Sequence, residues 1–367
     1  MFSFHRMPKP LPLLPIPLPC RTKKMKTMMT LLYFPLVLTG CLPYLYHLGK
    51  EQSAIILGRE KIEVVLNKPN IDSKTKEKLN LIREVRNFAI EELALNENGG
   101  FEYFTKLDRE EIGWNVSASE AFALKSYTWW FPIAGTVPYK GFFDKEMAKE
   151  LENQLKNKGY DTRIRAIGGY STLGWFSDPV LSPQLTWADH RLVGLVIHEM
   201  AHATAYLPGD TTLNESYASF VEEIGTERFY IKKEGGNSVH LEKFKREKIK
   251  RETTIKLLKL YADRLKQVYD SDKDINLKQI LKQSIILEFK TKVIEDKLVP
   301  EEKSKEFLAR DWNNEDFLGA LRYHSGEVSF LNLYEKSNRD LSIFHKEVKK
   351  LFELPKEKRT EFLSQDL

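Results

Sequence analysis

The sequence has 367 residues, of which 42% are hydrophobic and 30% charged, a composition that indicates a globular body and excludes wholesale disorder. Its net charge of +5 is unevenly placed, because the first 40 residues hold six basic residues and no acid. Without that segment the charge is −1, so no nucleic-acid partner is expected.

Residues 1–40 have the layout of a leader and lipoprotein signal peptide. The stretch "RTKKMKTMMTLLYFPLVLTGC" has basic residues, then an apolar run too short for a comfortable membrane span, then small residues. Its end resembles a bacterial lipobox, in which Cys41 becomes the lipidated first residue. The only other cysteine, Cys20, precedes the proposed cut, so no internal disulfide is expected. We expect a lipid anchor in a membrane of the bacterial cell envelope, facing the periplasm or cell surface; the alternative is an N-terminal anchor helix.

A tether over residues 41–70 is predicted to lead into a first helix at Ile71–Leu95. Leu81, Val85 and Phe88 are spaced for one face of this helix, and "NENGG" ends it.

Residues 101–190 are predicted to be rich in β-structure. Strand composition with Gly or Pro borders marks "EIGWNVSAS", "SYTWWFPIAG", "DTRIRAIGG" and "YSTLGWFS", and a helix is predicted at Lys145–Lys158. The stretch Gly168–Pro179 is compatible with a strand edge that pairs with a peptide or with an ordinary sheet strand. Phe131–Phe143 predicts a fixed loop.

The next predicted helix, Arg191–Tyr206, is almost wholly apolar but carries His198, Glu199 and His202. The two histidines lie four residues apart, so they project from one face about 6 Å apart along the axis and can bind one zinc ion. Glu199 points about 100° away, where it can take a proton from water. Burying these groups is costly unless a zinc ion compensates them. The alternative is a polar cluster satisfied by backbone and water.

A second helix, Thr212–Tyr230, offers Glu215, Glu222 and Glu223 as a third ligand. Glu215 stands in its first turn, after a Pro-Gly break that folds the helix back. The letters "TLNE" also fit a capping box in which Glu215 turns back to Thr212. We favour Glu215 as the ligand; a glutamate that does not bind the metal can orient a ligand histidine.

The rest of the chain is predicted to be helical, near 239–269, 276–297, 315–335 and 340–352. The basic segment Lys243–Arg251 is interpreted as a solvated helix face, with contact to anionic lipid headgroups as the alternative. Tyr217, Tyr323 and His324 are the candidates for donating a hydrogen bond to a developing oxyanion.

"HEMAH" followed by "LNESYASFVEE" resembles the gluzincin-type zinc peptidases, in which a glutamate on a second helix completes the site. More closely, the chain resembles a family of bacterial lipoproteins described as zinc aminopeptidases. The likeness spans most of the chain, through "GC", "WNV", "FPIAGTVPYKGFFD", "YSTLGWFSDP", "HEMAHATAY", "NESYASFVEE" and "WNN". It implies a zincin-like fold and a hydrolase, with His198, His202 and Glu215 as metal ligands and Glu199 as the base.

The sequence therefore predicts an α+β, mainly helical protein: a small mixed β-sheet, the HExxH helix, and a C-terminal helical region. We expect a zincin-like domain over 71–235, with residues 236–367 packing on it. The predicted function is a lipid-anchored zinc metallopeptidase that hydrolyses a peptide or polypeptide, with an aminopeptidase favoured. The alternatives are an envelope endopeptidase with the same site and a non-catalytic surface binding protein stabilised by zinc. Glu199 argues against the last, because a structural zinc needs no base.

Overall fold

The computed structural model describes residues 42–98, 100–131, 135–169, 177–321 and 326–364. Cys41, the leader, the predicted strand "YSTLGWFS" (170–177, all but its last residue), Tyr323 and His324 lie outside the described residues. The chain divides into two units, Met1–Gly49 and Lys50–Leu367, with the boundary inside helix α2 (Leu42–Leu57). Within the described part of the chain, no helix is long and apolar enough to cross a membrane.

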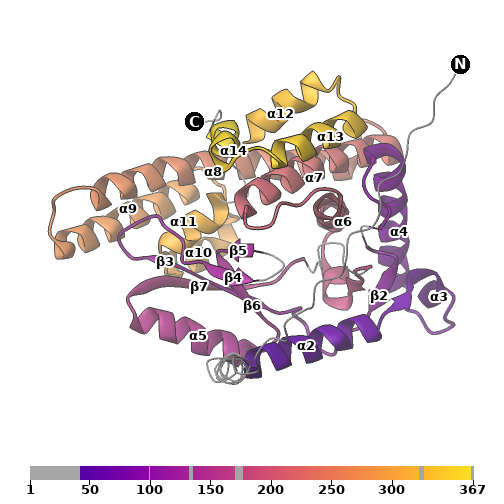
Figure 1. Ribbon diagram of the computed structural model, residues 1–367, viewed down its shortest axis with the longest axis horizontal. Coiled ribbons are helices and arrows are strands. Elements are labelled where there is room, and N and C mark those ends of the chain that lie inside the picture. Colours follow the sequence, from indigo (N-terminus) through magenta and orange to yellow (C-terminus); the bar gives the residue numbers. More distant parts are fainter. Residues whose placement is uncertain (1–41, 99, 132–134, 170–176, 322–325, 365–367) are drawn as a thin grey trace, which may run out of the picture. The chain divides into compact units, whose positions relative to one another are not determined.

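Within the described ranges, the β-structure of the larger unit consists of three small sheets (Figure 1). Strands β1 (Glu60–Lys61), β2 (Tyr103–Thr105) and β8 (Val180–Leu181) form the first, and β4 (Trp129–Phe131) pairs with β5 (Gly135–Val137). The sheet that matters most for the site has the order β6-β3-β7 and is antiparallel throughout. Its strands are β6 (Tyr139–Phe142), β3 (Trp114–Glu120) and β7 (Tyr160–Ala166).

The two faces of the β6-β3-β7 sheet have different roles. Side chains alternate along a strand, and Val116 and Ala118 of β3 are buried while Asn115 and Ser117 share the other face. Asn115 lies opposite Arg165 of β7 in the register, so both polar groups belong to one face. Helix α5 (Lys145–Asn157), with an Asp144 N-cap, packs on β7 and β3.

Helices build the remainder of the larger unit. The first hydrophobic core is formed mainly by side chains of α4 (Ser73–Leu93), α6 (Asp189–Thr204) and α7 (Thr211–Glu234). Helices α12 (Glu327–Lys336) and α13 (Leu341–Phe352) pack on α7 and add to this core. A second core lies between α8 (Val239–Tyr269), α9 (Ile275–Glu295) and α11 (Asn314–Leu321). Shorter elements are α3 (Ile62–Leu66), α10 (Ser304–Ala309), α14 (Lys356–Leu363), η2 (Ser182–Thr186) and η3 (Glu301–Lys303).

The α+β, mainly helical class predicted from the sequence is confirmed. Strands expected at "WNVSAS" and "DTRIRA" are β3 and β7, and the helices near 315–335 are α11 and α12. Residues 42–66, for which a tether was expected, hold the helices α2 and α3 as well as β1. The proposed division between 71–235 and 236–367 stays a prediction, because both segments belong to the larger unit.

Candidate metal centre

Helices α6 and α7 form an antiparallel pair whose connection is fixed by Asn214. The side-chain amide of this buried residue donates to the Leu207 carbonyl oxygen, and its oxygen accepts from the Leu207 backbone N–H, both at 2.8 Å. Helix α7 begins at Thr211, and its N-cap is Asp210, whose carboxylate accepts from a backbone N–H in the first turn. Since Asp210 caps the helix, Glu215 is left to face α6.

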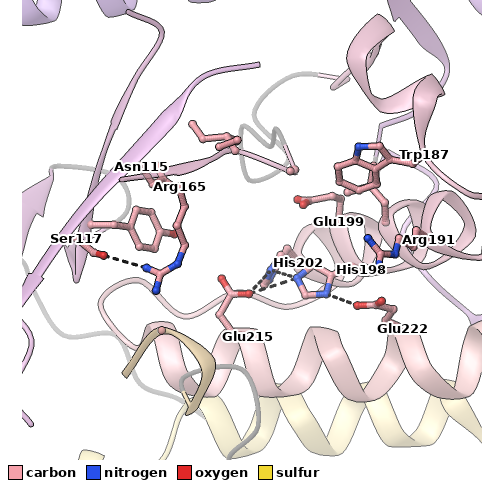
Figure 2. Close-up of a pocket in the computed structure, with 17 residues that line it drawn as sticks. Asn115, Ser117, Arg165, Trp187, Arg191, His198, Glu199, His202, Glu215 and Glu222 are labelled. Atoms are coloured by element: carbon pink, nitrogen blue, oxygen red, sulfur yellow. Dashed lines mark hydrogen bonds and ion pairs between the residues drawn. The ribbon is translucent and has the colours of Figure 1, made fainter. Parts of the chain in front are cut away.

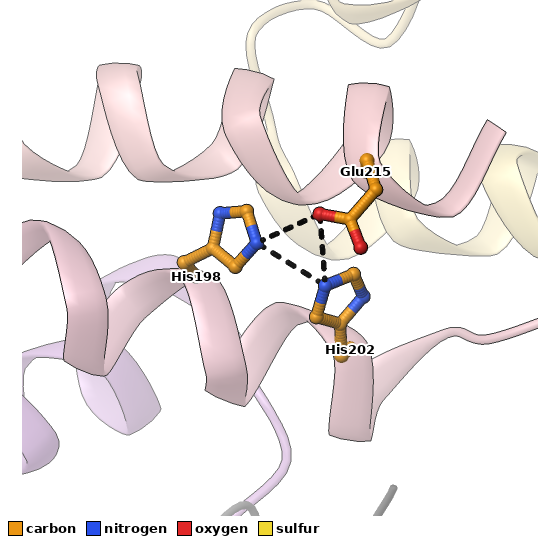
Figure 3. A group of neighbouring side chains, drawn as sticks. All are labelled: His198, His202 and Glu215. Carbon is orange, nitrogen blue, oxygen red and sulfur yellow. Dashed lines mark hydrogen bonds and ion pairs between the residues drawn. The ribbon is translucent and has the colours of Figure 1, made fainter. Parts of the chain in front are cut away.

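Three side-chain atoms from these two helices converge on one point (Figure 3). The Nε2 atoms of His198 and His202 are 3.2 Å apart. Oε2 of Glu215 lies 3.3 Å from Nε2 of His198 and 3.7 Å from Nε2 of His202. The sequence-predicted trio is therefore brought together, with each residue offering one metal-ligating atom.

Burial and charge shape the properties of this trio. Only 7% of His202 and 9% of Glu215 is exposed. Burial alone would lower the pKa of His198, but hydrogen bonds and charge from Glu215 and Glu222 outweigh burial and raise this pKa well above its usual value. Burial would raise the pKa of Glu215, yet the two histidines hold it well below its usual range. The arrangement therefore favours a positive charge among these side chains.

Glu222 contacts the far side of the His198 ring. Its Oε2 lies 2.9 Å from Nδ1 of His198, so this nitrogen is engaged while Nε2 faces Glu215. Gly194 makes room for Glu222, because a Cβ at Gly194 would stand 2.7 Å from Oε1 of the carboxylate. Nδ1 of His202 is buried and has no hydrogen-bond partner among the described residues.

Glu199 lies in the same cavity but outside the converging trio (Figure 2). Burial raises its pKa, and the charges of His198 and His202 oppose this rise. The backbone of Gly169, just after β7, passes so close that a Cβ there would stand 2.0 Å from Oε1 of Glu199. The carboxylate is thus held between α6 and the end of a strand.

The cavity has a volume of about 450 Å³ and a second wall that sequence reasoning missed. The β6-β3-β7 sheet supplies Asn115, Ser117, Tyr139 and Arg165 to this wall, and α6 with its preceding turn adds Trp187 and Arg191. Alternation in "WNVSAS" and "TRIRA" marks which residues share a face, but only the strand register puts that face opposite the histidines.

Two further sequence candidates lie elsewhere. Tyr217 is fully buried, and its hydroxyl lies 2.9 Å from Nδ1 of His345. Nε2 of His345 donates to the Leu93 carbonyl oxygen, so Nδ1 is the acceptor for the Tyr217 hydroxyl. This hydrogen bond occupies Tyr217 in the core, away from the residues that line the cavity. Glu223 pairs with Lys248 and Arg251 of the basic segment and does not join the trio.

A family model described as "Putative aminopeptidase" matches residues 43–363. The chain belongs to this family. Membership of the aminopeptidase family supports peptidase activity on a peptide substrate. The matched span includes both helices of the candidate site and the sheet across the cavity. No curated protein and no solved structure shows a significant match to the chain.

Proposed function

We propose that the chain is a zinc-dependent peptidase in which His198, His202 and Glu215 hold one zinc ion and Glu199 is the general base. The observation that carries this proposal is the convergence of two Nε2 atoms and one carboxylate oxygen in a cavity that also holds a separate carboxylate. Membership of the aminopeptidase family supports the reaction class.

The donor set fits zinc in both chemistry and dimensions. Two imidazole nitrogens and one carboxylate oxygen are a common catalytic zinc set, which leaves a position open. Zinc bonds of about 2.0–2.1 Å in a tetrahedron place neighbouring ligand atoms about 3.3 Å apart. The three edges here measure 3.2, 3.3 and 3.7 Å. A carboxylate ligand beside two neutral rings also offsets part of the charge that a divalent cation brings into a buried site.

Bound zinc would supply a Lewis acid that polarises the scissile carbonyl and makes water more acidic. The protein's own part belongs to Glu199. Its carboxylate takes the proton from the attacking water and delivers it to the amine that leaves when the C–N bond breaks. Burial beside Gly169 raises the pKa of Glu199, which makes the carboxylate a stronger base than one in water.

Glu222 has a positioning role in this proposal. A carboxylate that accepts from Nδ1 of His198 fixes the tautomer in which Nε2 carries the lone pair for the metal. His202 differs from His198, because its Nδ1 has no such partner in the described part of the chain. We therefore assign the orientation of one ligand, His198, to Glu222.

The test of the catalytic role is Glu199→Gln, with Glu223→Gln as the matched control. Both changes neutralise one carboxylate, but Glu223 pairs with basic residues of α8 instead of lining the zinc-side cavity. Glu199→Gln should keep bound zinc and lose peptide hydrolysis, while Glu223→Gln keeps both. Equal hydrolysis in wild type and Glu199→Gln would contradict the proposed base. Cleavage of free but not N-acetylated peptides would support aminopeptidase action over endopeptidase action.

We further propose that Cys41 carries a lipid that attaches the protein to a membrane of the bacterial cell envelope, facing the periplasm or cell surface. The support is the lipobox-like "LTGC" after an apolar run. Expression with labelled palmitate in a bacterial host should label the wild type and not Cys41→Ala. Equal labelling of the two proteins would remove this part of the proposal.

A further inference from the structure

Arg165 stands on the sheet wall of the cavity, opposite the converging trio. It belongs to β7, whereas the trio comes from α6 and α7, and both sets line the same space of about 450 Å³ (Figure 2). This volume lies in the range of small-ligand sites, about 300–1,000 Å³. A ligand in the cavity therefore meets the candidate metal centre on one side and a guanidinium on the other.

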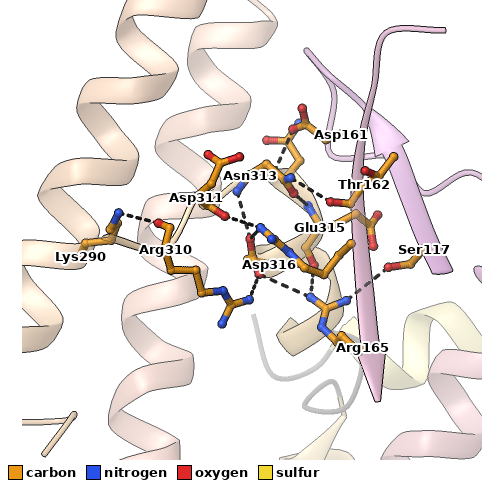
Figure 4. A network of polar contacts seen from close by, with 12 residues as sticks. Ser117, Asp161, Thr162, Arg165, Lys290, Arg310, Asp311, Asn313, Glu315 and Asp316 are labelled. Carbon is orange, nitrogen blue, oxygen red and sulfur yellow. Dashed lines mark hydrogen bonds and ion pairs between the residues drawn. The ribbon is translucent and has the colours of Figure 1, made fainter. Parts of the chain in front are cut away.

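The guanidinium of Arg165 is held in place from two elements (Figure 4). Nη1 donates to Ser117 Oγ of β3 at 3.2 Å, and Nη2 donates to the backbone oxygen of Glu315 in α11 at 2.8 Å. Gly319, one turn further along α11, lies against the group, since a Cβ there would stand 2.8 Å from Nη2 and 3.0 Å from Cζ. The position is thus set before any ligand arrives, which reduces the entropy cost of binding.

Arg165 has the longest ion pair in a group of three arginines around Asp316. Asp316 is the shared carboxylate, and both Arg163 and Arg310 make direct ion pairs with it. Nη2 of Arg165 is 3.6 Å from the same carboxylate, so it receives the weakest of the three contacts. The Arg165 side chain is also 37% exposed, against 2% for Asp316.

Donor capacity remains on this guanidinium. An arginine has five N–H donors in a planar fork. Among the residues that the structure describes, hydrogen bonds to Ser117 and Glu315 use two of these donors. The remaining N–H groups of this preorganised, partly exposed guanidinium can donate to the two oxygens of a carboxylate.

We propose that Arg165 binds a carboxylate of the substrate, which makes the enzyme selective for short peptides whose carboxylate reaches across the cavity while the scissile bond lies at the candidate metal centre. The inference rests on the proposed peptidase function for the reaction, but not for the binding of the carboxylate itself. A terminal carboxylate and an acidic side chain share this chemistry, and the choice of peptides separates them.

The test uses trialanine, trialanine amide, and Ala-Ala-Glu amide. Affinity is measured by calorimetry and hydrolysis by product analysis, for wild type, Arg165→Gln and Arg163→Gln. Arg163→Gln is the matched control, because it removes a cation from the same Asp316 network without altering the cavity lining. A charge-assisted hydrogen bond predicts that wild type binds a carboxylate peptide about 10- to 100-fold more tightly than trialanine amide. Arg165→Gln should abolish that ratio, and Arg163→Gln should keep it.

Gly319→Ala gives a second variant that retains every charge. Its methyl group displaces the guanidinium, so the preference for the carboxylate peptide should fall without vanishing. This variant decides the matter if Arg165→Gln does not fold. Preference for trialanine identifies the terminal carboxylate, and preference for Ala-Ala-Glu amide identifies the side chain; either supports the inference.

Equal affinity of wild type for all three peptides would overturn the inference. So would a carboxylate preference that survives in both Arg165→Gln and Gly319→Ala. If Arg165 acted only on the transition state, Arg165→Gln would lower the hydrolysis of the amide and acid peptides equally. The ratio of their affinities would then be the same in wild type and in both variants. Absence of hydrolysis with an intact binding ratio would instead count against the proposed peptidase function alone.

Discussion

Gly169→Ala is the substitution that tests most selectively how Glu199 is positioned. An added Cβ would stand 2.0 Å from Oε1 of Glu199, whereas such contacts essentially never fall below 3.0 Å. The carboxylate must therefore move by at least 1.0 Å. A displacement of about 1 Å in a catalytic group costs about 100-fold in rate. The candidate metal-binding trio is expected to remain intact, because the clash falls on Glu199, and Leu195 stays at an ordinary contact distance of 3.6 Å.

Gly168→Ala is the matched control for this substitution. A Cβ at Gly168 meets the Trp187 ring at 2.9 Å and leaves Glu199 untouched. We expect kcat on a peptide substrate to fall about 100-fold in Gly169→Ala, with bound zinc unchanged, and to fall far less in Gly168→Ala. Metal content is measured by elemental analysis on the same samples. Full activity in Gly169→Ala, or zinc lost together with activity, would refute the reasoning.

Three other residues give predictions that follow from their contacts. Glu222→Gln removes the charged acceptor for Nδ1 of His198 and should weaken zinc affinity about 10- to 100-fold in competition with a chelator; unchanged affinity would contradict its positioning role. Asn214→Ala loses two hydrogen bonds to Leu207 and should lower the free energy of unfolding by roughly 2 kcal/mol in urea titrations. A change within experimental error would show that Asn214 does not hold the connection between α6 and α7. Burial lowers the pKa of His345 to about 4, below about 6.5 in the unfolded chain. The unfolded state therefore binds the proton first, and stability should fall by up to about 3 kcal/mol as pH drops from about 6.5 to about 4. The stability of His345→Gln should lack this pH-dependent component. Identical profiles of unfolding free energy against pH in wild type and variant would contradict the prediction.

The helical spacing of His198 and His202 was enough to predict their meeting, because four residues make about one turn. Glu215 was harder, since the letters "TLNE" suit both a helix cap and a metal ligand. In the structure Asp210 is the N-cap, so Thr212, which the capping box would need at that position, lies inside α7. The sequence therefore predicted which three side chains come together, and the start of α7 shows that Glu215 is not needed as part of a helix cap.

The opposite wall of the cavity was beyond sequence reasoning. Arg165 is brought near the trio by the register of β7 against β3 and by its bond to α11, 150 residues further along the chain. Gly169 is similar, since its role depends on how closely a strand end approaches α6. Such long-range approaches depend on packing between distant segments, and periodicity within one segment does not encode them. The donor candidates Tyr323 and His324 lie outside the described residues, and Tyr217 belongs to the core.

Zinc content is the most direct measurement of the central claim. Residues 42–367 are expressed and purified, and bound zinc is determined for wild type, His198→Ala and Glu215→Ala. The account predicts about one equivalent in wild type and its loss or severe weakening in both variants, because each removes one of the three converging ligand atoms. Wild-type protein without zinc, even after loading, would contradict the account, and zinc lost only in His198→Ala would contradict the assignment of Glu215.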